Sequence, residues 1–138
     1  MKKIYLLMIT AAMLVACSNE EKQKTTEKVA PIEQNNLEVE EGLKAGTTEY
    51  DYATLLADEV SVNAKVKFVG IVYATKDGGF ELISGVDNTA DEIVMVDDIR
   101  LGERTNIDKG TAVTVYGSYN GKNADGVPVI KGIFIDLE

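Results

Sequence analysis

The chain contains one cysteine and no histidine, and these two counts limit the chemistry that its side chains can perform. Histidine is the commonest general base and a frequent zinc ligand, so its absence removes imidazole catalysis and His-based zinc sites. Ser–His and Cys–His nucleophile pairs are excluded for the same reason. A single cysteine forms neither an intramolecular disulfide nor a multi-cysteine metal site. Cys17 is therefore the side chain whose surroundings are the most informative.

Cys17 ends a segment that begins with two lysines and continues as an apolar run from Ile4 to Val15. About a dozen apolar residues are too few to cross a bilayer, which takes roughly 20, and the arrangement is typical of an export signal. The four residues Leu14-Val15-Ala16-Cys17 resemble the lipobox of bacterial lipoproteins. This resemblance implies that residues 1–16 are removed as a signal peptide and that Cys17 becomes the lipidated N-terminus.

The charge of the chain bears on its partners. The sequence has 14 basic and 23 acidic residues, which gives a formal charge of −9. Removal of the signal peptide would take away Lys2 and Lys3, which leaves 12 basic residues and a charge of −11. A net negative field does not attract nucleic-acid phosphates or anionic lipid headgroups. Acyl chains on Cys17 are therefore the expected membrane contact. We expect a lipid anchor on the extracytoplasmic face, of a Gram-positive cell membrane or alternatively a Gram-negative outer membrane.

Carboxylates are the remaining candidates for chemistry. One acidic stretch could offer oxygen ligands to a hard cation such as Ca²⁺, and it contains Asp87, Asp91, Glu92, Asp97 and Asp98. Its spacing does not match the EF-hand pattern, so a solvated loop without metal or cofactor is the preferred interpretation. Asp97 and Asp98 could instead pair with Arg100 and Arg104. No two carboxylates can be assigned to a shared pocket, and we expect no enzymatic activity.

Residues 17–48 are rich in Glu, Lys, Gln, Thr and Asn and contain no aromatic residue. Such a composition buries too little apolar surface to offset the entropy of ordering the backbone, so we expect a disordered tether. Within it, Leu37–Leu43 is the part most able to pack as a short lead-in. The folded domain is expected over residues 49–138.

The folded part begins with a helical pattern and continues with alternation typical of strands. Residues 52–58 have apolar side chains three and four apart, which predicts a short helix capped by Asp51 or Thr48. From Val60 to Phe68 apolar and polar residues alternate, and beyond Gly70 the alternation is shifted by one. This pattern predicts a long first strand with a bulge or bend at the glycine.

Four more strands are expected, separated by polar turns. They are Phe80–Ile83, Glu92–Val96, Thr111–Tyr119 and Val127–Leu137. Residues 97–110 are too polar to predict a full helix.

Five strands with a long first strand bent at glycine resemble the OB-fold, a small Greek-key barrel. The resemblance is carried by Val66–Val72, Lys109–Gly117 and Lys131–Ile135, and it is closest to the anticodon-binding-like OB domains of small exported lipoproteins. It implies a mainly β barrel with a short N-terminal helix over residues 49–138. An SH3-like barrel is the structural alternative.

OB-folds commonly bind ligands on their second and third strands and at two adjoining loops. By this analogy the candidate binding residues are Tyr73, Phe80, Glu81, Met95, Tyr116, Tyr119, Lys122 and Asn123. A single-stranded nucleic-acid site needs aromatic rings in a positive groove. The few lysines here are outnumbered by acids, so nucleic acid is disfavoured, and packing of the rings inside the barrel is the preferred interpretation.

These observations predict a lipid-anchored, non-catalytic binding module that contacts a protein or another envelope component through the barrel loops. Binding of single-stranded nucleic acid or oligosaccharide is the alternative hypothesis. A divalent-metal-dependent hydrolase is a weaker one. All three rest on resemblance of fold and not on an identified site.

Overall fold

The computed structural model describes residues 32–84, 90–102 and 104–138. The predictions for the signal peptide, Cys17 and Asp87 fall outside these residues. The chain forms two compact units, one ending at Val39 and one running from Glu40 to the C-terminus. None of the helices in the described ranges is long and apolar enough to span a membrane.

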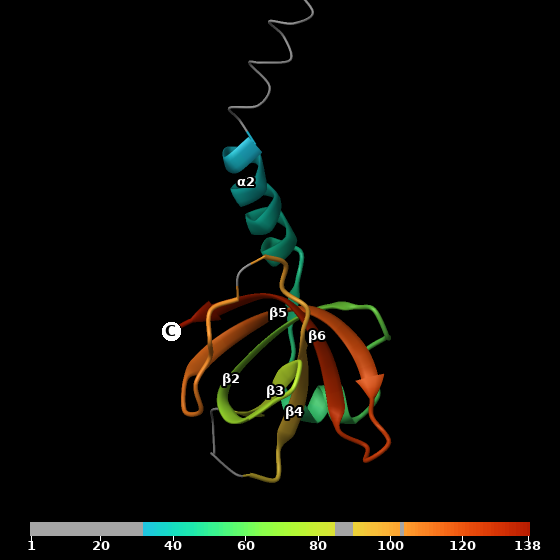
Figure 1. The fold of residues 1–138 in the computed structure, drawn as a ribbon. Coiled ribbons are helices and arrows are strands. Elements are labelled where there is room, and N and C mark those ends of the chain that lie inside the picture. The colour runs from blue at the N-terminus through green and yellow to red at the C-terminus, as the bar shows by residue number, and fades with distance from the viewer. Residues whose placement is uncertain (1–31, 85–89, 103) are drawn as a thin grey trace, which may run out of the picture. The chain divides into compact units, whose positions relative to one another are not determined.

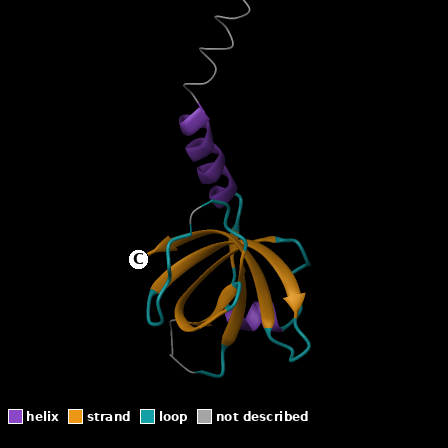
Figure 2. Cartoon of the chain, viewed as in Figure 1, coloured by secondary structure: helices purple, strands orange, loops and turns teal. Residues whose placement is uncertain are grey.

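Five strands of the second unit close into a barrel (Figure 1, Figure 2). They are β2 (Lys65–Lys76), β3 (Gly79–Ser84), β4 (Ile93–Asp98), β5 (Ala112–Lys122) and β6 (Pro128–Leu137). The order is β2-β3-β4-β6-β5, and β5 pairs back with β2. Strands β4 and β6 are parallel, and the other pairs in the barrel are antiparallel. This is the connectivity of the OB-fold, so the predicted fold class is confirmed.

Two short elements precede the barrel strands in this unit. Strand β1 (Thr48–Glu49) pairs with β2 in parallel. Helix α3 (Tyr52–Leu56) begins at Asp51, whose side chain accepts a hydrogen bond from the Thr54 amide at 2.8 Å. The predicted short helix and its Asp51 cap are therefore present.

The core lies inside the barrel and is covered at one end by α3. Leu55 is fully buried there, and the Tyr119 hydroxyl donates to the Leu55 carbonyl at 2.9 Å. The remaining core side chains are mostly β-branched, as expected for a barrel interior, and include Val66, Phe68, Val72, Phe80, Leu82, Val94, Val96, Val113, Val115 and Ile130.

The first barrel strand starts later than its sequence pattern predicts. Strand β2 begins at Lys65, and the preceding alternation belongs to a turn. Asn63 has a φ of 71°, a left-handed conformation that interrupts a strand, and its amide donates to the Tyr119 carbonyl at 2.7 Å. Val62 is 58% exposed as a result. The period of two in this short turn imitates the pattern of a strand.

The predicted shift of alternation at Gly70 is wrong. Val66, Phe68, Gly70 and Val72 all face inward, and the bulge lies between Val72 and Ala74. Gly70 has a different role, because it pairs with β3 and β5 at the same time. A Cβ atom at this position would lie 2.7 Å from the Ile83 carbonyl oxygen. Only glycine lets the two neighbouring strands approach this closely.

Part of the segment expected to be disordered is helical. Helix α2 covers Ile32–Ala45, and its last turn belongs to the barrel unit. There the Lys44 Nζ atom lies 2.6 Å from Asp136 and 2.8 Å from Glu40, and 5.2 Å from the centre of the Tyr116 ring. Burial tends to lower the pKa of Lys44, but the two carboxylates outweigh it and raise that pKa. Composition alone does not reveal these tertiary contacts.

We expect Gly70→Val to destabilise the domain by about 2 kcal/mol or more, because the new side chain would collide with the Ile83 backbone. Urea unfolding followed by circular dichroism measures the loss. Gly42→Ala is the matched control, since a Cβ there meets nothing within 4 Å and the helical position favours alanine. A Gly70→Val protein as stable as the wild type would show that this close approach is not required.

Candidate functional site

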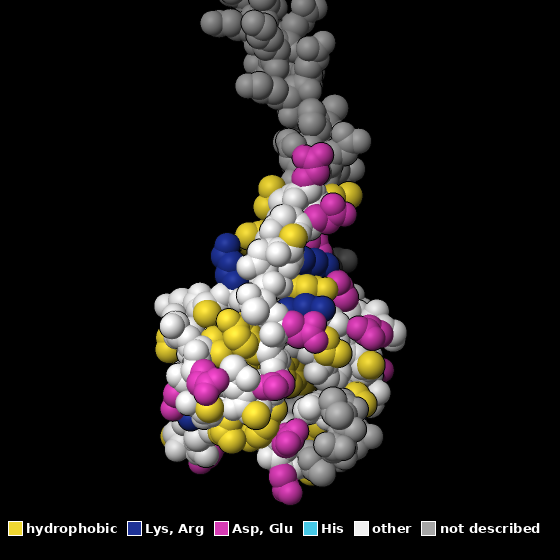
Figure 3. Space-filling view, turned by 180° about the vertical axis from the view of Figure 1, so that it is seen from behind, with side chains coloured by type: hydrophobic (Ala, Val, Ile, Leu, Met, Phe, Trp, Pro, Cys, Tyr) yellow, Lys and Arg dark blue, Asp and Glu magenta, His cyan; other side chains and the backbone are white. Residues whose placement is uncertain are grey.

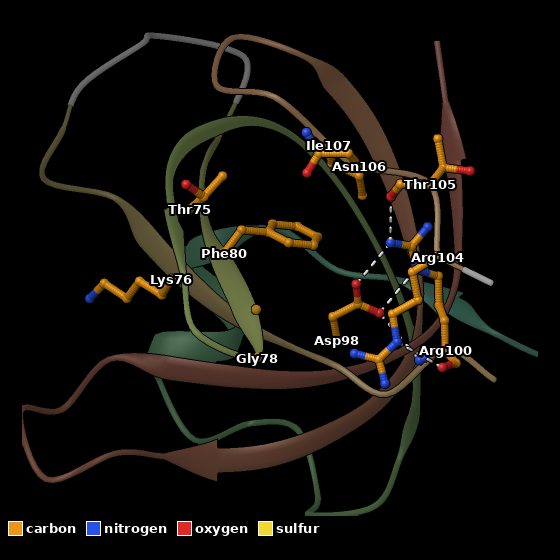
Figure 4. Close-up of a pocket in the computed structure, with 11 residues that line it drawn as sticks. Thr75, Lys76, Gly78, Phe80, Asp98, Arg100, Arg104, Thr105, Asn106 and Ile107 are labelled. Carbon is orange, nitrogen blue, oxygen red and sulfur yellow. Dashed lines mark hydrogen bonds and ion pairs between the residues drawn. The ribbon is translucent and has the colours of Figure 1, made fainter. Parts of the chain in front are cut away.

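A pocket of about 270 Å³ opens at one end of the barrel (Figure 4). Its walls come from the end of β2, the β2–β3 turn, the end of β4 and the loop between β4 and β5. The lining residues are Thr75, Lys76, Gly78, Gly79, Phe80, Asp98, Arg100, Arg104, Thr105, Asn106 and Ile107. Two arginines and several hydroxyl or amide groups thus surround one carboxylate and an aromatic ring.

The β2–β3 turn forms one wall because it is held against the end of β4. Gly78 has a φ of 80°, which a tight turn requires and which glycine adopts without strain. The Asp98 amide donates to the Gly78 carbonyl at 2.8 Å. This hydrogen bond fixes Asp98 next to the turn.

Asp98 and Arg100 form a two-point ion pair at the centre of the site. Arg100 donates from Nε to Oδ1 at 2.9 Å and from Nη2 to Oδ2 at 2.8 Å, and its backbone amide donates to Oδ1 at 3.2 Å. The two side chains are only 12% and 14% exposed. The pairing of these two residues was one of the possibilities predicted from the sequence, but its burial was not.

The environment of Asp98 favours its charged form. Burial is the largest single influence and would raise the pKa, but hydrogen bonds from the Arg100 side chain and amide, with the charges of Arg100 and Arg104, together lower it. Asp98 is therefore an anion that orients Arg100, and a poor proton donor near neutral pH.

The loop after β4 is organised around Arg100. Arg100 Nη2 donates to the Thr105 carbonyl at 3.1 Å, and Arg104 Nε donates to the Arg100 carbonyl at 3.1 Å. Ile107 is 6% exposed and anchors the far end of the loop in the core. A segment without regular secondary structure thereby presents both arginines at the pocket.

The base of the pocket is apolar. Phe80 points inward from β3, is 4% exposed, and its ring faces the space beside Asp98 and Ile107 in Figure 4. Lys76 extends away from the two arginines and forms an ion pair with Glu81. The cationic character of the pocket therefore comes from Arg100 and Arg104.

The residues selected from the sequence are dispersed. Of these, Phe80 lines the pocket and Glu81 lies beside it as the partner of Lys76. Met95 is half-buried and pairs with Glu81 across β3 and β4. Tyr73 is 36% exposed, and the Lys109 ammonium lies 5.2 Å from the centre of its ring.

The other four selected residues lie away from the pocket. Tyr119 is a core residue, and Tyr116 lies beneath Lys44. Lys122 donates to Asp58 at 2.9 Å, and the Asn123 side chain accepts hydrogen bonds from the amides of residues 125 and 127. These contacts are structural and do not converge on one site.

Sequence reasoning missed Thr75, Thr105, Asn106 and Ile107 as pocket residues. They lie in a turn and an irregular loop, and nothing in their types or spacing marks them. Within the described ranges no group of three or more His, Cys, Asp or Glu side chains could hold a metal ion. Asp98, considered above as a metal ligand, binds Arg100 instead.

No protein-family model matches the chain, and no curated protein matches its sequence. Several solved structures, including the following three, resemble it at low identity. The telomere capping protein Ten1 from Saccharomyces pombe is 18% identical, with a TM-score of 0.49 over 66% of this chain and 80% of Ten1. A chain of the S. pombe Stn1–Ten1 complex is 17% identical, with a TM-score of 0.47 over 66% and 75% of the two chains. The hypothetical protein ygiW from E. coli is 16% identical, with a TM-score of 0.43 over 67% and 89%.

We expect acid to weaken the domain through Asp98. Its pKa is lowered in the folded state, so its contribution to stability is present above the unfolded value of about 4 and is lost as the pH falls through the folded value. Asp98→Asn should remove about 1–3 kcal/mol of unfolding free energy at pH 7 and flatten the acid dependence. Urea unfolding between pH 2.5 and 7 measures both.

Asp125→Asn is the control, because the Asp125 side chain is exposed in a turn and only its backbone amide takes part in the turn hydrogen bonds. If the two variants unfolded with the same pH dependence, the Asp98–Arg100 pair would contribute nothing to acid stability.

Proposed function

We propose that the protein is an exported, lipid-anchored, non-catalytic OB-fold module that binds a protein or another envelope component at the pocket of Figure 4. The observation that carries the proposal is the position of this pocket. One wall is the turn between the first two barrel strands, a loop through which OB-folds commonly bind ligands. The other wall is the arginine loop after β4, so ligand contacts can come from both sides.

The chemistry of the pocket supports binding over catalysis. Its carboxylate, Asp98, has both oxygens occupied by Arg100 and a lowered pKa. A general acid or base needs a pKa near the working pH, and the lowered pKa of Asp98 moves it away from neutral pH. The arginines can orient and neutralise a bound group without breaking a bond.

The anchor is proposed from the lipobox at Leu14–Cys17. Acyl chains on Cys17 would hold the protein at the extracytoplasmic membrane face, where an envelope partner can reach the barrel. The chain upstream of the barrel would act as the spacer.

Binding of a single-stranded nucleic acid or an oligosaccharide is the second candidate function. The exposed Tyr73 ring with Lys109 above it favours this candidate, because an aromatic face beside a cation can stack on bases or sugars. The net charge of −9 disfavours the nucleic acid. On the barrel face in Figure 3, acidic side chains are dispersed among hydrophobic ones.

Cys17→Ala should abolish lipidation, because the thiol is the site of acyl attachment in the proposed anchor. Metabolic labelling with a palmitate analogue in a bacterium that processes lipoproteins measures it, and fractionation shows whether the protein leaves the detergent phase. Ser18→Ala, next to the cysteine, is the control and should label normally. Equal labelling of Cys17→Ala and wild type would refute the anchor.

Filling the pocket should abolish partner binding. Thr75→Trp places a large side chain at the rim of the pocket. We expect the immobilised variant to retain only a small fraction of the envelope components that the wild type binds. Val69→Trp is the control, because Val69 is 40% exposed on the same strand outside the pocket. Retention that is unaffected by Thr75→Trp, or lost equally in both variants, would contradict the pocket assignment. Competition by an oligonucleotide at low salt would favour the second candidate.

A further inference from the structure

We infer that the pocket recognises an oxyanion, a carboxylate or a phosphate, carried on a small apolar or ring-shaped body. The inference rests on the proposed function, since it names the chemical class of the ligand for the same site. It is argued from the hydrogen-bond donors left over at the two arginines, from the state of Asp98, and from the apolar base of the pocket.

The arginines retain hydrogen-bond donors that no described residue occupies. Arg100 uses Nε and Nη2 on Asp98 and the Thr105 carbonyl, and within the described part of the chain its Nη1 makes no hydrogen bond. Arg104 donates from Nε to the Arg100 carbonyl, and neither of its Nη groups is bonded to a described residue. Each Nη carries two N–H donors, so the rim offers several donors from planar, permanently charged groups.

The charge balance of the pocket also favours an anion. Asp98 lies between the arginines, but its oxygens accept from Arg100 and its negative charge is compensated there. Lys76 is compensated by Glu81 in the same way. Arg104 remains as the cation without a carboxylate partner among the described residues. A guanidinium group binds carboxylate and phosphate oxygens through paired hydrogen bonds.

The base and size of the pocket limit the rest of the ligand. Phe80 and Ile107 supply apolar surface, and a volume of about 270 Å³ holds roughly one ring with its substituents. The whole chain carries −9, which repels a polyanion but has little effect on a single oxyanion beside a cation. A small oxyanion therefore fits the pocket better than a charged polymer.

Three probes test the ligand class on the isotope-labelled full chain in detergent micelles. N-acetyl-phenylalanine carries a carboxylate, phenyl phosphate carries a phosphate, and N-acetyl-phenylalanine amide is the matched neutral compound. We expect saturable shifts at the Gly78, Thr105 and Asn106 amides with the anions, at least about tenfold weaker binding of the amide, and weaker binding at high salt. The anion that binds with the higher affinity shows whether the pocket prefers a carboxylate or a phosphate.

Two variants separate recognition from general charge. Arg104→Gln should weaken the anion about tenfold, and it is a mild change because Arg104 is exposed and makes one hydrogen bond. Lys65→Gln is the control, since it removes an equal charge from an exposed position outside the pocket, and it should change affinity by less than about twofold. Circular dichroism checks that both remain folded.

Equal binding of the amide and the acid, equal effects of the two variants, or the absence of shifts at the pocket would each overturn the inference. Its failure can be distinguished from failure of the proposed function. Loss of envelope retention in Thr75→Trp together with no response to either anion would keep the binding module and reject the oxyanion. Retention that survives Thr75→Trp would reject the pocket itself.

Discussion

Closure of the barrel depends on the double pairing of β2. Its first half pairs with β5 and its second half with β3, and the two pairings overlap at Gly70 and Ile71. At Gly70 the Ile83 carbonyl comes so close that no Cβ fits. Without both pairings the sheet would stay open, and the buried side chains of β2 would lose their opposite wall. The same close approach recurs at Gly79 and Gly117, where a Cβ atom would meet the carbonyl oxygens of Val96 and Lys131, so closure depends on glycine at several strand positions.

The same sheet builds the pocket. The pairing of β3 with β4, which begins at Gly79 and Asp97, brings the β2–β3 turn against the end of β4, where the Gly78 carbonyl accepts from the Asp98 amide. Asp98 then orients Arg100, and Arg100 in turn holds the Thr105 carbonyl and, through its own carbonyl, Arg104. A single buried ion pair thus holds an irregular loop in place as one wall of the pocket. The role of the Asp98–Arg100 pair is to position this loop, and its net contribution to stability is modest because the cost of desolvating the two charges opposes their attraction.

The last turn of α2 shows how tertiary contacts overcome a disorder-prone composition. The Lys44 ammonium lies between two carboxylates and beside two aromatic rings, those of Tyr116 on β5 and Phe134 on β6. An isolated helix of this length is marginal in water. The barrel supplies the partners that the helix lacks, so the barrel unit includes residues from Glu40 onward and not only those from residue 49.

The sequence by itself determined the mainly β class, the OB-like strand succession and the helix capped by Asp51, because these follow from local periodicity and capping. The start of the first barrel strand was predicted too early, because alternation of apolar and polar residues does not distinguish the turn at Asn63 from a strand. The bulge was predicted at Gly70, because a glycine within a strand pattern does not show whether it marks a bulge or a close approach of two strands. Only the tertiary structure decided the site. Of the eight candidate binding residues selected from the sequence, Phe80 alone lines the pocket. Asp98, Arg100 and Arg104, which the sequence suggested only as ion pairs or a cation site, line it too, and Thr105, Asn106 and Ile107 join it from a loop without regular secondary structure. Such contacts depend on which chain segments meet when the barrel closes, and no local pattern records that meeting.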